Sequence, residues 1–133
     1  MKSERGAERQ ILFVDDDTDS LAMYVKAVSL ANHKADIASS AMEGWDLIKK
    51  NSYDLIFVDL NIPGVSGLEL LQRIRRDRKE RKTPVIVLSA MPEESLVEDV
   101  LKAGARLFME KPVALDELYS VIEKYKGKTR RSA

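Results

Sequence analysis

The sequence contains no cysteine, so disulfide bonds, thiolate catalysis and cysteine metal sites are excluded. Its 22 lysine and arginine residues balance 22 aspartate and glutamate residues, and this zero net charge favours neither nucleic acid nor a membrane surface as a partner. No apolar run is long enough to span a membrane, and the polar N-terminus lacks the apolar segment of a signal peptide. We therefore expect a cytoplasmic protein with no direct nucleic-acid partner and no membrane partner.

What the sequence does contain is an alternation of short apolar runs and segments with helical periodicity. A chain of 133 residues is long enough for one domain with its own core. We expect strands at 10–14, 34–38, 55–58, 85–88 and 106–109, and helices at about 18–30, 40–50, 66–76, 92–104 and 115–125. This order predicts an α/β fold with a five-stranded parallel sheet between two layers of helices. The domain is expected to span 10–126, between a flexible N-terminus at 1–9 and a flexible tail or start of a linker at 127–133.

Polar side chains follow four of the five expected strands. The first strand runs into Asp15 and Asp16, the third ends in Asp59, the fourth in Ser89, and the fifth leads to Lys111. Ligands of parallel α/β sheets bind beyond the carboxyl ends of the strands, so these side chains are expected to share one edge. Three carboxylates there would repel one another without a cation, and carboxylate oxygens suit Mg²⁺.

The chemistry of this edge points to phosphoryl transfer. A buried strand has little reason to end in Asp59 unless that carboxylate is used, because burying an unpaired charge is costly. A carboxylate nucleophile, a divalent metal, the ammonium of Lys111 and the hydroxyl of Ser89 together suit formation of an aspartyl-phosphate. Taken alone, each of these residues would be an ordinary cap or turn residue, and Asp17 is expected to be just the N-cap of the first helix.

Four segments of the chain resemble the response-regulator receiver domain of two-component signalling, including the chemotaxis regulators. They are residues 11–17, 54–70, 84–90 and 104–112, in the family's order and spacing, and the resemblance covers roughly residues 9–126. It implies a flavodoxin-like fold with the strand order 2-1-3-4-5. It also implies a signalling switch, not an enzyme, that accepts a phosphoryl group and loses it slowly.

The resemblance assigns roles to individual residues. Asp59 would be the phosphoacceptor, with a histidine kinase or a histidine phosphotransfer protein as donor. Mg²⁺ (or Mn²⁺) would be held by Asp15, Asp16, Asp59 and the backbone carbonyl of Asn61. The other catalytic residues would be Lys111 and Ser89, which would contact the phosphoryl group.

The resemblance also implies a switch. Ser89 and Phe108 would move together, although they stand where Thr and Tyr are commoner. The movement would alter a surface made of the fourth helix, the fifth strand and the fifth helix, which would bind an output domain or a downstream protein. A homodimer through this face is a further option, and the Lys111–Pro112 peptide bond is expected to be cis.

Two other functions remain open at this point. The chain could be a degenerate receiver used only as a binding module. It could also be a phosphatase similar to the haloacid dehalogenases, with Asp15 attacking and Asp17 as the acid, although Asp59 would then have no role. Three structural details are also expected: a solvated helix end over the basic run 73–82, an exposed His33, and close helix packing at Gly44.

Overall fold

The computed structural model describes residues 8–62, 64–91 and 93–125. Its elements alternate strictly in the order β1 (Gln10–Val14), α1 (Thr18–Leu30), β2 (Lys34–Ala38), α2 (Ala41–Lys50), β3 (Leu55–Asp59), α3 (Gly67–Arg76), β4 (Val85–Ser89), α4 (Glu94–Lys102), β5 (Leu107–Glu110) and α5 (Leu115–Lys124). All strand pairs are parallel, and the sheet order is β2-β1-β3-β4-β5. The predicted fold class and strand order are confirmed.

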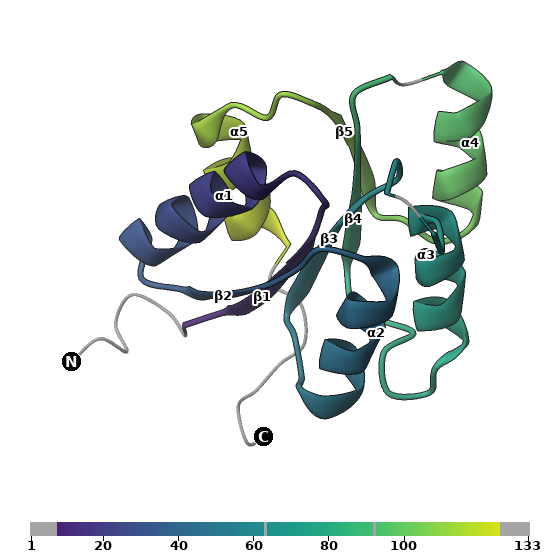
Figure 1. Ribbon diagram of the computed structural model, residues 1–133, viewed down its shortest axis with the longest axis horizontal. Coiled ribbons are helices and arrows are strands. Elements are labelled where there is room, and N and C mark those ends of the chain that lie inside the picture. The colour runs from purple at the N-terminus through teal and green to yellow at the C-terminus, as the bar shows by residue number, and fades with distance from the viewer. Residues whose placement is uncertain (1–7, 63, 92, 126–133) are drawn as a thin grey trace.

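Helices cover both faces of the sheet (Figure 1). Helices α1 and α5 lie on one side, and α2, α3 and α4 lie on the other. Successive side chains of a strand point to opposite faces, so Leu12 and Val58 pack on the α2–α4 side, whereas Phe13 and Phe57 pack on the α1–α5 side. The three central strands are therefore almost continuously apolar and buried. Burial of each aliphatic or aromatic side chain stabilises the fold by about 1.5–3 kcal/mol. This packing holds the ends of the strands in place.

Two glycines occupy positions that suit a residue without a side chain, and the close packing predicted at Gly44 is confirmed. A Cβ at Gly44 in α2 would lie 2.9 Å from Cγ2 of Val14, so the helix approaches the sheet as closely as glycine allows. Gly104 follows the C-cap of α4 with a φ of +113°, a conformation that suits glycine after a helix end. A Cβ at Gly104 would lie 2.7 Å from Nε of Arg75, so the end of α4 lies close against a side chain of α3.

The basic run 73–82 differs from the prediction. Helix α3 ends at Arg76, but the segment is not simply a solvated end. Arg75 is half-buried and donates to the carbonyl oxygens of Gly104 at 2.8 and 3.0 Å and of Thr83 at 2.8 Å. Glu80 is only 1% exposed, and it accepts a hydrogen bond of 2.7 Å from the Thr83 hydroxyl. The prediction of a solvated end was therefore wrong for Arg75 and Glu80.

The exposure of two leucines also differs from the helix patterns. Leu101 of α4 and Leu115 of α5 belong to the apolar pattern of the predicted helices, yet they are 44% and 47% exposed. No helix in the described residues is long and apolar enough to cross a membrane. The predictions for Pro63, Pro92, the segment 1–7 and the tail 127–133 lie outside the described residues.

His33 is half-buried, contrary to the prediction that it is exposed. Its Nδ1 atom accepts a hydrogen bond of 3.0 Å from the backbone N–H of Arg9. Burial, together with the charge of Arg9, lowers the pKa of His33 below its ordinary value of 6.5. The neutral ring is therefore the form that fits the folded chain.

We expect the free energy of unfolding to fall as the pH drops below 6.5, because the unfolded chain then binds a proton at His33 before the folded chain does. Above that pH the ring is neutral in both states, so it does not change the free energy of unfolding with pH. Urea unfolding of the wild type and of His33→Gln at several pH values between about 5 and about 8 measures the difference. Parallel pH profiles for the two proteins would contradict this assignment.

Candidate functional site

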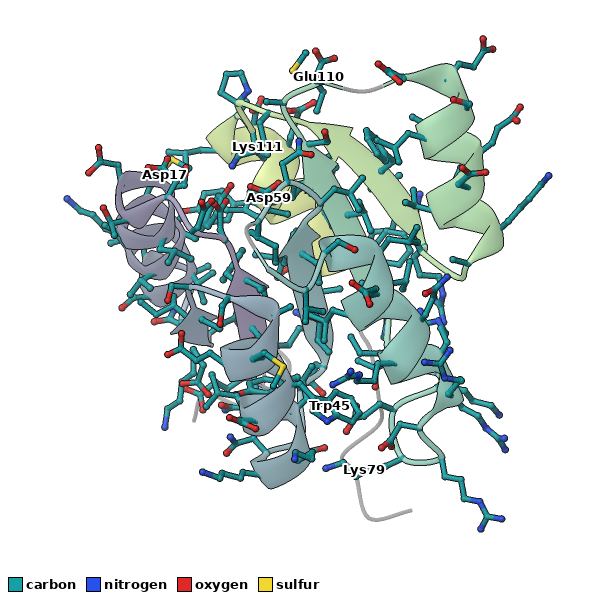
Figure 2. The ribbon with its side chains drawn as sticks, turned by 45° about the vertical axis from the view of Figure 1, so that its right-hand side comes forward. Asp17, Trp45, Asp59, Lys79, Glu110 and Lys111 are labelled. Carbon is teal, nitrogen blue, oxygen red and sulfur yellow. The ribbon has the colours of Figure 1, made fainter. Side chains whose placement is uncertain are left out.

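The carboxyl ends of β1, β3, β4 and β5 meet at one edge of the sheet. Asp15 follows β1, Asp59 and Ser89 are the last residues of β3 and β4, and Lys111 follows β5 directly. Figure 2 shows Asp59 and Lys111 close together, whereas Trp45 and Lys79 lie at the opposite end of the molecule. The structure thus brings together the residues that the sequence placed at the strand ends.

Lys111 joins the two buried carboxylates. Its Nζ lies 2.9 Å from Oδ2 of Asp15 and 3.0 Å from Oδ2 of Asp59, and these acids are only 1% and 4% exposed. Burial alone would lower the pKa of Lys111, but the hydrogen bonds to Asp15 and Asp59 outweigh it and raise the pKa, so the ammonium stays charged. Burial raises the pKa of Asp15, although the hydrogen bond from Lys111 opposes this effect. The cluster therefore holds more negative charge than its one cation neutralises.

Each buried carboxylate is also fixed by a backbone amide. The N–H of Asp17 donates to Oδ1 of Asp15, and the N–H of Asn61 donates to Oδ1 of Asp59, both at 2.9 Å. One oxygen of each carboxylate thus faces a backbone amide, and the other faces Lys111. Such contacts hold the side chains in one orientation before any ligand arrives.

Three carboxylates in the cluster are positioned to hold a metal ion. Oxygen atoms of Asp15, Asp16 and Asp59 all lie within 4.8 Å of one another, and Asp16 is exposed to solvent. Carboxylate oxygens with one open side fit a hard divalent cation that keeps water ligands. The carbonyl of Asn61 belongs to the loop directly after β3, and its part in metal binding stays a prediction.

The side chain of Asn61 makes a contact that the sequence did not indicate. Its Nδ2 donates a hydrogen bond of 3.2 Å to Oγ of Ser89, and the backbone N–H of Met91 donates to the same oxygen at 3.2 Å. Ser89 is fully buried, so these two donors fix its hydroxyl. Asn61 and Ser89 are 28 residues apart, and no spacing rule connects an asparagine with a serine at that distance.

Phe108 lies on the same face of the sheet as Ser89. It pairs in register with Val87 of β4, and residues two apart in a strand share a face. Its ring is half-buried and packs against the core on the α2–α4 side. Ser89 and Phe108 are therefore diagonal neighbours on adjacent strands, which is a suitable arrangement for coupled movement.

A glycine at the start of α3 lies against the backbone of Asp59. Gly67 is the first residue of α3, and a Cβ there would lie 2.5 Å from the backbone oxygen of Asp59 and 2.8 Å from Cα of Leu60. The helix begins with a capping box in which Ser66 and Glu69 bond each other's backbone N–H groups. The helix start and the end of β3 are thus in direct backbone contact. On the opposite side of the site, the Lys111–Pro112 peptide bond is cis, as the resemblance implied.

Comparison with known proteins agrees with this geometry. The family model for the response regulator receiver domain matches residues 11–123. The sensory/regulatory protein RpfC of Xanthomonas campestris pv. campestris is 31% identical over 126 residues, which cover 93% of this chain but only 17% of that protein. The polar-differentiation response regulator DivK of Brucella ovis is 24% identical over 119 residues, with 90% of this chain and 97% of that protein covered.

The fold is also found among solved structures. The chemotaxis protein CheY4 of Vibrio cholerae superposes with a TM-score of 0.85 at 22% identity, over 90% of this chain and 99% of that one. This likeness concerns the fold, whereas the family model covers nearly all of the described sequence. The chain belongs to the response regulator receiver domain family of two-component signalling.

Proposed function

We propose that Asp59 accepts a phosphoryl group from a phosphohistidine, carried by a histidine kinase or a histidine phosphotransfer protein. The observation that carries this proposal is the position of Lys111, 2.9 Å from Asp15 and 3.0 Å from Asp59, with Asp16 completing an acidic cluster. A charged ammonium next to a fixed carboxylate stabilises the negative charge of a group being transferred to that carboxylate.

In this reaction an oxygen of Asp59 forms the new O–P bond while the N–P bond of the donor breaks. The electron pair of the broken bond stays on the imidazole nitrogen of the donor. Lys111 contacts one phosphoryl oxygen, and the Ser89 hydroxyl donates its proton to another in a hydrogen bond. Slow hydrolysis of the acyl phosphate returns the carboxylate, so the chain acts as a switch.

Asp15, Asp16, Asp59 and the backbone carbonyl of Asn61 would hold Mg²⁺ or Mn²⁺. When bound, the ion offsets the negative charge of the incoming phosphoryl group. The close approach of three carboxylates supports this assignment, and so does the burial of Asp15, which raises its pKa. A divalent cation would relieve the mutual repulsion that one lysine leaves in place.

The switch proposal concerns the surface formed by α4, β5 and α5, which includes Ser95 and Asp99. Tyr119 of α5 faces α1 instead, where its hydroxyl donates to the carbonyl oxygen of Ala27 at 3.0 Å. A movement of Ser89 towards the phosphoryl group would let Phe108 change its packing, because the two side chains share one face of the sheet. A phosphoryl group need only shift an existing equilibrium by a few kcal/mol to change this surface. An output domain or a downstream protein would bind it, and a homodimer through the same face remains a prediction.

Asn61→Ala should change the switch without abolishing phosphorylation. The substitution keeps the backbone N–H that holds Asp59 and removes the side-chain hydrogen bond to Ser89. One such hydrogen bond contributes about 1 kcal/mol. Its loss should therefore raise the population of conformers in which Ser89 has left its resting position roughly fivefold in the unphosphorylated protein. The amide chemical shift of Phe108 in NMR spectra reports this population. Asn51→Ala, which removes a hydrogen bond to Leu47 in α2, is the control and should leave that shift unchanged.

The phosphatase alternative is disfavoured by the environment of Asp17. The Ser20 hydroxyl donates a hydrogen bond of 2.6 Å to Oδ2 of Asp17, and this contact lowers the pKa of that carboxyl. A general acid needs a pKa near the working pH, so Asp17 is shifted in the wrong direction for that role. A degenerate receiver would be expected to lack part of the acidic cluster or Lys111, and this chain has both.

The decisive experiment is intact-mass analysis after incubation with Mg²⁺ and acetyl phosphate. We expect the wild type to gain one phosphoryl group and Asp59→Asn to gain none, because asparagine is not a nucleophile of this kind. An adduct that persists in Asp59→Asn and disappears in Asp15→Asn would favour the phosphatase. If a phosphohistidine donor also leaves the wild type unmodified, the chain is a binding module.

A further inference from the structure

A groove of about 520 Å³ runs along the outer edge of β5, between that strand and the N-terminal half of α5. The strand contributes residues 107–110, and the helix contributes Asp116, Glu117, Ser120 and Val121. Strand β5 is the last in the sheet, so none of the described strands pairs with its outer edge. Backbone groups along such an edge are available to an additional strand.

The rim of this groove is acidic. Glu110, Asp116 and Glu117 are exposed, and within the described part of the chain none of them has an ion-pair partner. Glu117 accepts a hydrogen bond from the backbone N–H of Ala114, and Asp116 accepts one from the backbone N–H of Glu117. Lys111 follows Glu110 in sequence, but its ammonium is bound between the two buried carboxylates of the phosphoacceptor site. Three uncompensated negative charges therefore gather in a chain whose net charge is zero.

The floor of the groove is apolar. Leu107 is half-buried, and Met109 and Val121 are 8% and 7% exposed. An occupant that fits both rim and floor carries cations beside apolar side chains. In an extended segment, successive side chains point to opposite sides, so alternation of the two kinds is the matching pattern.

We propose that the groove between β5 and α5 binds an extended segment of a partner protein in which Lys or Arg residues alternate with apolar residues. The segment adds to the edge of β5 by backbone hydrogen bonds, and its cations pair with Glu110, Asp116 and Glu117. Nucleic acids and anionic membranes are repelled by the same three carboxylates.

Two other basic candidates fit less well. The tail 126–133 contains Lys126, Lys128, Arg130 and Arg131 but no apolar residue larger than alanine, so it cannot fill the floor. The basic run 73–82 of a second copy lies partly in α3 and partly in a loop held by Arg75, so it does not offer an extended strand. A separate protein is the occupant that matches both chemistry and shape.

One end of the groove, at Glu110, lies next to the phosphoacceptor site. Glu110 pairs in register with Ser89 and directly precedes Lys111. If phosphorylation moves Ser89 and Lys111, it alters the end of the groove and thereby the affinity for the segment. This coupling rests on the proposed function, whereas binding of the basic segment does not.

The test uses two fluorescent peptides of about twelve residues, long enough to cover a strand of ordinary length. In one peptide Arg alternates with Val, and in the other Glu alternates with Val. Fluorescence anisotropy with the full chain should show binding of the Arg peptide at least about tenfold tighter than binding of the Glu peptide, with affinity falling at high salt. NMR shifts should map to residues 107–110, Ser120 and Val121. Equal affinity for both peptides, or shifts elsewhere, would overturn the proposal.

A matched pair of variants separates the groove from general surface charge. Glu110→Gln combined with Asp116→Asn should weaken binding of the Arg peptide about tenfold, because two of three rim charges are lost. Glu8→Gln combined with Asp46→Asn changes the net charge equally at two exposed positions outside the groove, and should alter the affinity less than about twofold. Equal losses in both double variants would reject the groove as the binding site. Concentration-dependent dimerisation that the Arg peptide abolishes would identify a second copy as the occupant instead.

The coupling is tested by repeating the titration after treatment with acetyl phosphate and Mg²⁺. We expect a several-fold change in affinity for the Arg peptide when intact mass shows one phosphoryl group per chain. An adduct with unchanged affinity would overturn the coupling. If no adduct forms, the proposed function fails, and the groove is then judged by the charge discrimination and the variants alone.

Discussion

Replacing Gly67 by alanine is expected to lower the free energy of unfolding by about 3 kcal/mol, the upper end of the range for overpacking. The added Cβ would lie 2.5 Å from the backbone oxygen of Asp59 and 2.8 Å from Cα of Leu60, and backbone atoms cannot rotate away as a side chain can. Either the start of α3 or the end of β3 must shift. Urea unfolding measures the loss, and intact mass measures the accompanying fall in phosphorylation of Asp59.

Gly64→Ala is the control for this substitution. Gly64 has a φ of +83°, so alanine there costs about 1 kcal/mol of backbone strain, but no atom lies within 4 Å of the added Cβ. The loss in the free energy of unfolding should therefore be much smaller for Gly64→Ala than for Gly67→Ala. Similar losses for the two variants would show that contact with Asp59 is not what requires glycine at position 67.

Lys111→Met should destabilise the protein by about 3 kcal/mol in the absence of divalent cations. Removing one partner of a buried ion pair leaves an uncompensated buried charge, and here two carboxylates lose their shared cation. The value lies at the low end of the usual range because the lysine side chain is 16% exposed. Thermal or urea unfolding measures the change, and Lys82→Met, at an exposed position with no ion pair among the described residues, should be nearly neutral.

Addition of Mg²⁺ should then restore part of the lost stability. A ligand at about one hundred times its dissociation constant adds about 2.7 kcal/mol to the folded state. The gain should be larger for Lys111→Met than for the wild type, because Asp15 and Asp59 have no other cation in the variant. A gain that persists in an Asp16→Asn and Asp59→Asn double variant would place the ion elsewhere.

Much of the fold and the positions of the site residues could be predicted from the sequence. Buried strands of a parallel sheet are short and apolar, so the polar residue that ends each of them is conspicuous. Asp59 after an apolar run and Lys111 before Pro112 are visible for this reason, and parallel pairing brings such ends to one edge. The helix pattern also predicted the close packing at Gly44.

What the sequence could not supply depends on contacts between distant segments. Glu80 in a basic run suggests a solvated charge, but the loop folds back and encloses it beside Thr83. Arg75 is one of five arginine residues between 73 and 81, so nothing in the local sequence marks it as the one that binds the Gly104 carbonyl. The Asn61 contact with Ser89 likewise exists only once β3 and β4 are adjacent. Helix periodicity also overestimated the buried faces, because an apolar residue at helical spacing is buried only where another element packs on it, and Leu101 and Leu115 are exposed among the described residues.

The lysine of the site follows an edge strand of the sheet. Lys111 is 96 residues from Asp15 and 52 residues from Asp59, and it follows an edge strand that pairs only with β4. Contacts of such long sequence separation form late, since the chain between them must be ordered first. During synthesis the acidic cluster of β1 and β3 emerges well before its cation, so under the proposed function a nascent chain would accept no phosphoryl group until β5 docks. Local opening of β5 in the mature protein would remove Lys111 from the two carboxylates while the remaining sheet stays folded.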